Sequence, residues 1–161
     1  MNRVSTLFLK IAVIFIGIPI LALCIFVVPH IATYAAGFFP NISFYMELLV
    51  FIVFYGAAVP FYIALYQAFK LLSYIDKNKA FSELSVKALK VIKICAVTIS
   101  IWYVAAMPLF YLVADKDDAP GVIFIGLIII FASLVIAVFA AVLQKLLKEA
   151  IDIKSENDLT V

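Results

Sequence analysis

Residues 122–143 read VIFIGLIIIFASLVIAVFAAVL and contain no charged side chain. A helix of about 20 apolar residues is long enough to cross the hydrocarbon core of a bilayer, which is about 30 Å thick. The apolar residues are continuous instead of alternating, which argues against a strand of a membrane barrel. Ser133, Ala137 and Ala141 recur at every fourth position, so one face is narrow enough for another helix to approach closely. This stretch therefore predicts a transmembrane helix.

Three more apolar runs lie N-terminal to this one, at residues 94–113, 48–68 and 11–31. The chain of 161 residues is 68% hydrophobic and 14% charged, whereas soluble domains are about 45–50% apolar and about 25% charged. The sequence therefore predicts an all-α integral membrane protein, a single bundle of four transmembrane helices that occupies residues 1–161.

The run 11–31 has a competing interpretation as a secretory signal peptide, because Arg3 and Lys10 precede it. Its apolar length exceeds the usual range of about 7–15 residues in a signal, so we expect an uncleaved first helix. Pro19 lies near its middle and predicts a kink, which neighbouring helices can accommodate. The run 48–68 carries a predicted ridge of small or ring residues at spacing four, namely Gly56, Pro60, Ala64 and Ala68.

The basic residues predict the orientation of the chain. If four helices cross the membrane, every one of the 12 Lys and Arg except Lys116 falls on the side of the two termini. Short loops rich in Lys and Arg stay in the cytoplasm. We therefore expect residues 70–93 and the tail 144–161 to be cytoplasmic, with outer loops at residues 32–43 and 114–121.

The predicted cytoplasmic loop reads KLLSYIDKNKAFSELSVKALKVIK over residues 70–93. Residues 76–79 are typical of a turn. Ser82 is a plausible N-cap, and Glu83 would lie favourably in the first helical turn. The helix that starts there is expected to run directly into the third span.

Lysines recur at spacing three in this helix, at Lys87, Lys90 and Lys93, and therefore share one side. An apolar side is predicted to hold Leu84, Ala88, Val91 and Cys95. The lysines could bind a protein or anionic lipid headgroups. The simpler interpretation, which we favour, is that they only set the topology.

The tail at residues 144–161 becomes acidic toward its end, at Glu149, Asp152, Glu156 and Asp158. It lies on the same predicted side as the basic loop, so the two could attract each other. Exposed ion pairs contribute only about 0–1 kcal/mol. A solvated helix end is therefore the favoured interpretation of these charges.

Two polar residues lie near the outer ends of the first two spans. Glu47 is the only acid near a span, and intramembrane acids often couple to protons or cations. His30 could meet it across the short outer connection and sense external pH, since histidine titrates near 6.5. The favoured interpretation places both side chains in the wet interfacial region.

Enzymatic chemistry is not expected. Cys24 and Cys95 would differ in depth by roughly 14 Å at about 1.5 Å per helical residue, and a disulfide needs Cα atoms within about 7 Å. A single histidine cannot provide bis-histidine haem ligation, and the chain has no zinc motif or glycine-rich phosphate loop. We expect no catalytic residue, cofactor or metal, and no direct binding of nucleic acid.

Two polar segments carry a resemblance to a known family. IDKNKAFSELSVKALKVIKICA (residues 75–96) and LLKEAIDIKSENDLTV (residues 146–161) resemble the YoaS-like bacterial membrane proteins, a family with a domain-of-unknown-function label. The resemblance implies a bacterial cytoplasmic membrane. It also implies a partnership with a small Cro/CI-type helix-turn-helix regulator, because members are often encoded beside one.

The family carries no catalytic residues, so the resemblance only directs attention to the two polar segments as candidate partner-binding sites. The candidates are Asp76, Asn78, Lys79, Phe81, Ser82, Glu83 and Leu84 in the loop, and Glu156, Asn157, Asp158 and Leu159 in the tail.

Three functions remain open from the sequence. The first is a non-enzymatic membrane sensor or partner that holds a cytosolic transcriptional regulator at the bilayer. The second is a small oligomeric transporter or export component, motivated by Glu47 and by the proline-interrupted helices. The third is protection against a membrane-active peptide. The faces of small residues could serve packing within one chain or a homo-oligomer.

Overall fold

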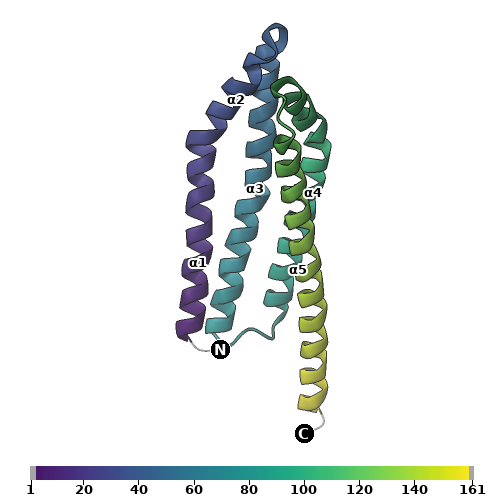
Figure 1. Ribbon diagram of the computed structural model, residues 1–161. Helices are drawn as coiled ribbons and strands as arrows, with labels where there is room; N and C mark the ends of the chain where they lie inside the picture. The colour runs from purple at the N-terminus through teal and green to yellow at the C-terminus, as the bar shows by residue number, and fades with distance from the viewer. Residues whose placement is uncertain (1–2, 160–161) are drawn as a thin grey trace.

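The computed structural model describes residues 3–159, and every regular element in this range is helical (Figure 1). The elements are α1 (Arg3–Ala22), η1 (Leu23–Val27), α2 (Val28–Gly37), η2 (Pro40–Ile42), α3 (Ser43–Asp76), α4 (Glu83–Asp117) and α5 (Gly121–Leu159). Within the described residues, four helical stretches are long and apolar enough to cross a membrane, α1 to α2 counting as one. The predicted all-α fold with four apolar helices is therefore confirmed.

The helices are longer than the apolar runs that predicted them. The predicted outer loops at residues 32–43 and 114–121 shrink to residues 38–42 and 118–120. The second of these turns is closed by Asp118, whose φ of 52° is left-handed, while the Ala119 N–H donates to the Ala114 carbonyl. Aspartate tolerates this conformation better than most residues. Capping therefore adds helical turns that hydropathy alone does not reveal.

The long helices pack in chain order as a row. The segment α1–α2 packs on α3, α3 on α4, and α4 on α5 (Figure 1). Along the helix axes, both ends of the described chain lie at the same end of the bundle as the loop 77–82. We call it the lysine-rich end. The inner helices α3 and α4 are thus covered on two sides, whereas α1 and α5 form the edges.

Two clusters of buried residues lie toward the opposite end of the bundle. One cluster joins α2 to α3 through Ala32, Ala35, Met46 and Val50, together with Ala36. A second cluster joins α3 to α4 and contains Val53, Ala57, Tyr103, Ala106 and Phe110. Alanine on one helix facing larger side chains on the next lets the backbones approach closely. Of the predicted small face on α5, Ser133 and Ala137 are buried.

Glycine serves the same purpose between α3 and α4. A Cβ placed on Gly56 of α3 would lie 2.5 Å from Cζ2 of Trp102. The indole of Trp102 also donates a hydrogen bond of 2.9 Å to the Val53 carbonyl. The predicted ridge therefore begins at a position where the absence of a side chain admits an aromatic ring from the next helix.

At Pro19, where the sequence predicts a kink, the α-helix is not interrupted. Pro19 lies inside the continuous helix α1, and the departure from α-helical geometry falls at η1, a π-helical segment directly before Pro29. There the Val28 N–H donates to the Leu23 carbonyl, five residues earlier. In that register the Cys24 carbonyl would need the N–H of residue 29, which proline lacks.

Tyr55 of α3 supplies the missing donor. Its hydroxyl donates a hydrogen bond of 2.7 Å to the Cys24 carbonyl. Inside a bilayer no water can do this, and an unpaired carbonyl costs several kcal/mol. The irregular segment of the first span is therefore compensated by a side chain from the second.

We expect Tyr55→Phe to lower the stability of the folded chain by about 1–2 kcal/mol, since it leaves the Cys24 carbonyl without a donor. Thermal unfolding in detergent would measure this. Tyr111→Phe is the matched control, because the exposed Tyr111 makes no hydrogen bond to another described residue. Pro29→Ala restores a backbone N–H, so Tyr55→Phe should cost less in that background. An equal cost in both backgrounds would refute the explanation.

Candidate functional site

The loop at the lysine-rich end is held by its own backbone. The helix α3 continues to Asp76, so the predicted turn at residues 76–79 begins one residue later. Asn78 takes a left-handed φ of 59°, which asparagine tolerates, and thereby ends the helix. The Lys79 N–H then donates a hydrogen bond of 2.7 Å to the Tyr74 carbonyl. Asn78 therefore has a structural role in this loop.

Two serines close the loop from the other side. Ser82 occupies the predicted N-cap position of α4, and Glu83 lies in the first turn. The Ser82 side chain does not cap a backbone N–H, however, but donates to the Lys79 carbonyl. Ser85, which is fully buried, donates to the same carbonyl at 3.1 Å. Convergence of both hydroxyls on one acceptor gives the loop a defined shape.

The loop and the first turn of α4 expose two large apolar side chains. Phe81 is 55% exposed and Leu84 is 48% exposed. Of the residues on the predicted apolar side of α4, Ala88 and Cys95 are buried, whereas Leu84 is exposed. The face that contacts other helices starts instead at Ser85 and Val86. The neighbouring residues Lys77, Lys79 and Glu83 are exposed as well.

Asp76 differs from the other loop candidates because its carboxylate already has a partner. Lys10 of α1 lies 2.7 Å from Oδ2 of Asp76, and the two side chains are only 20% and 23% exposed. The Lys10 ammonium also lies 5.4 Å from the centre of the Phe69 ring. The pair ties the edge helix α1 to α3, so this carboxylate already makes a contact within the chain.

The ion pair also changes the acidity of Asp76, which lies beyond the apolar run 48–68. The hydrogen bond from Lys10 lowers the pKa of the carboxyl below its ordinary value of 3.8, against an opposing effect of desolvation. The buried Thr6 hydroxyl and the charges of Lys10 and Arg3 lower the pKa further. Asp76 is therefore ionised at neutral pH. Sequence analysis missed this contact, although Lys10 directly precedes an apolar run and Asp76 follows another.

The tail does not join the loop in a common acidic and basic cluster. The helix α5 continues to Leu159 and projects beyond the loop (Figure 1), and its candidates Glu156, Asn157, Asp158 and Leu159 are exposed. Between residues 3 and 159, no ion pair links the tail acids to the loop lysines. In this half of the bundle, Lys93 of α4 donates a hydrogen bond of 3.0 Å to the side chain of Gln144 of α5.

The contact that His30 could make with Glu47, which is not the favoured interpretation, is also absent from the described part of the chain. His30 is exposed on α2 and Glu47 is half-buried on α3, with no hydrogen bond or ion pair joining them. The helix α2 continues to Gly37 and α3 starts at Ser43, so each residue lies inside its own helix instead of at the connection. Helical packing thus separates side chains that the sequence places near one turn.

The residues that could perform redox or metal chemistry are dispersed. Cys24 and Cys95 are both free thiols. Between residues 3 and 159, no three His, Cys, Asp or Glu side chains come together in a way that could hold a metal ion.

Four long apolar helices, joined by short turns and packed through small residues, define a multi-pass helical membrane protein. The chain belongs to the family described as "Protein of unknown function (DUF2975)", whose sequence pattern matches residues 28–161. It is 76% identical to the uncharacterized membrane protein YoaS of Bacillus subtilis (strain 168) over 161 residues, which covers 100% of both chains. The resemblance seen in the sequence is thereby confirmed. No solved structure matches the chain.

Proposed function

We propose that this chain is a non-enzymatic membrane protein of the bacterial cytoplasmic membrane that holds a cytosolic helix-turn-helix regulator at the bilayer. The observation that carries the proposal is the exposure of Phe81, on a hydrogen-bonded loop that follows α3, and of Leu84, in the first turn of α4. A preformed loop loses little conformational entropy when a partner binds it.

The charges around these apolar groups support a protein partner. Lys77, Lys79 and Glu83 are exposed and lie within a few residues of Phe81 and Leu84, and a mixture of apolar and charged groups is the usual composition of a protein interface. The excess of lysine at this end favours a cytoplasmic position for the loop and for both termini. We propose the exposed tail residues 156–159 as a second, separate contact, because α5 extends past the loop.

The test uses a photo-crosslinking amino acid at position 81 of the full chain in living cells. We expect mass spectrometry to recover a helix-turn-helix protein. Introducing Leu84→Ser should lower the yield at least about tenfold, since burial of a leucine contributes about 1.5–3 kcal/mol. Ile153→Ser is the matched control, because Ile153 is a 66% exposed apolar residue at the same end.

A crosslinker at position 44 controls for the position in the molecule, since Phe44 is 71% exposed at the end of the bundle opposite the lysine-rich end. The proposal fails if position 81 yields only lipid or copies of the chain. It also fails if positions 81 and 44 recover the same proteins. Deletion of residues 156–161 should reduce the yield further if the tail is a second contact.

A further inference from the structure

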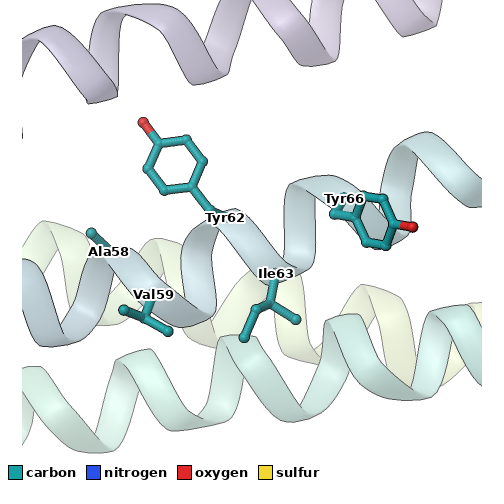
Figure 2. Close-up of a pocket in the computed structure, with 5 residues that line it drawn as sticks. All are labelled: Ala58, Val59, Tyr62, Ile63 and Tyr66. Carbon is teal, nitrogen blue, oxygen red and sulfur yellow. The ribbon is translucent and has the colours of Figure 1, made fainter.

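A shallow groove runs along α3, in the half of this helix nearer the lysine-rich end. Its volume is about 480 Å³, and its floor consists of Ala58, Val59, Tyr62, Ile63 and Tyr66. Figure 2 shows that all five residues come from one helix and that Tyr62 points toward the neighbouring helix. At a rise of about 1.5 Å per residue, the groove extends about 12 Å along the helix axis.

The surface of this groove is apolar. The hydroxyl of Tyr62 is occupied, since it donates a hydrogen bond of 2.8 Å to the Gly17 carbonyl of α1. This bond joins α3 to the edge helix α1 at the position of the groove. The groove lies within the apolar run 48–68, so a hydrocarbon chain can fill it without displacing a bound polar group.

A cation lies at the end of the groove. Lys70 follows Tyr66 by one helical turn, and its ammonium lies 5.3 Å from the centre of the Tyr66 ring. Among residues 3–159 no carboxylate pairs with Lys70. Lys10, the other ammonium near this part of α3, is neutralised by Asp76. Lys70 therefore provides a positive charge for a ligand where the apolar run ends.

We propose that this groove binds one anionic phospholipid from the leaflet at the lysine-rich end. An acyl chain would lie along residues 58–66, and the phosphate would contact the Lys70 ammonium. The apolar length followed by a single unpaired cation matches the order of groups in such a lipid. The site is separate from the partner surface of Phe81 and Leu84 and does not depend on it.

The test is native mass spectrometry of the delipidated full chain in detergent, with equal amounts of palmitoyl-oleoyl phosphatidylglycerol and phosphatidylcholine. We expect the native chain to retain the anionic lipid about fivefold more often, the ratio expected for one lysine. Lys70→Gln should bring this ratio to about one, while Lys70→Arg preserves it. Lys90→Gln, at an exposed lysine outside the groove, is the matched control and should leave the ratio unchanged.

Filling the groove provides a second measurement. Ala58→Phe should reduce retention of both lipids, whereas Ala132→Phe, at an exposed alanine of α5, should not. Equal retention of the two lipids by the native chain would overturn the proposal. So would an unchanged preference in Lys70→Gln, or full retention in Ala58→Phe. None of these outcomes bears on the regulator partnership, because the test of that proposal identifies proteins crosslinked at position 81.

Discussion

Gly56→Ala is expected to destabilise the folded chain by about 1–3 kcal/mol. The new Cβ would lie 2.5 Å from the Trp102 ring, so the ring must shift and lose its hydrogen bond to the Val53 carbonyl. Overpacking costs about 1–3 kcal/mol, and loss of the hydrogen bond costs about 1 kcal/mol more. The higher helix propensity of alanine returns only about 1 kcal/mol. Thermal unfolding in detergent, followed by circular dichroism, measures the net effect.

Two other glycines provide a graded comparison. At Gly126 the added Cβ would lie 2.8 Å from the Met107 sulfur, and a flexible thioether can move aside, so the cost should be smaller. At Gly37 nothing lies within 4 Å, and Gly37→Ala should leave the melting temperature unchanged or slightly higher. If Gly56→Ala behaved like Gly37→Ala, close packing of Trp102 against α3 would not contribute to the stability of the fold.

Breaking the ion pair between Lys10 and Asp76 is expected to have the other large effect. Asp76→Asn leaves the Lys10 ammonium largely buried without a counter-charge, and Lys10→Met leaves the carboxylate in the same position. Removing one member of a buried pair destabilises more than replacing both members with apolar groups. We therefore expect each single variant to melt earlier than the double variant Lys10→Met, Asp76→Leu.

Limited proteolysis of α1 provides a second measurement, because this pair is an ionic contact between α1 and α3. Cleavage should rise in the single variants and fall again in the double variant. Lys77→Met is the matched control, since Lys77 is exposed and has no ionic partner among the described residues. Single and double variants of equal stability would show that the pair does not position α1.

The pH dependence of this contact follows from the lowered pKa of Asp76. Its stabilisation is fully present above the unfolded-state value of 3.8 and is lost as the pH falls through the lower folded-state pKa. The stability difference between the native chain and Asp76→Asn should therefore stay constant from neutral pH to about pH 5 and diminish only below 3.8. The pair is thus a permanent link at physiological pH.

The local properties of the chain were predictable from its sequence. Hydropathy located the four apolar helices, and the serine at position 82 marked the start of α4. The polar segments at residues 75–96 and 146–161 identified the family. Each of these features depends on a continuous stretch of residues, because span length, capping and sequence similarity are properties of short segments.

Contacts between distant residues were decided only by the tertiary structure. Lys10 and Asp76 are 66 positions apart, and Tyr55 pairs with a carbonyl 31 positions away. Hydropathy cannot show which helix lies beside which, so it could not separate His30 from Glu47 or place Leu84 on the exposed side. The irregular segment before Pro29 likewise depends on Tyr55, a residue of another helix, for a hydrogen-bond donor.

Amino-acid order by itself therefore determined that this chain is a helical membrane protein and where its helices lie. Tertiary packing decided the row of helices, the loop that exposes Phe81, and the free cation at Lys70. The physical reason is that transfer of an apolar helix into a bilayer depends on its own residues. Which charges and carbonyls find partners depends instead on the helices packed against them.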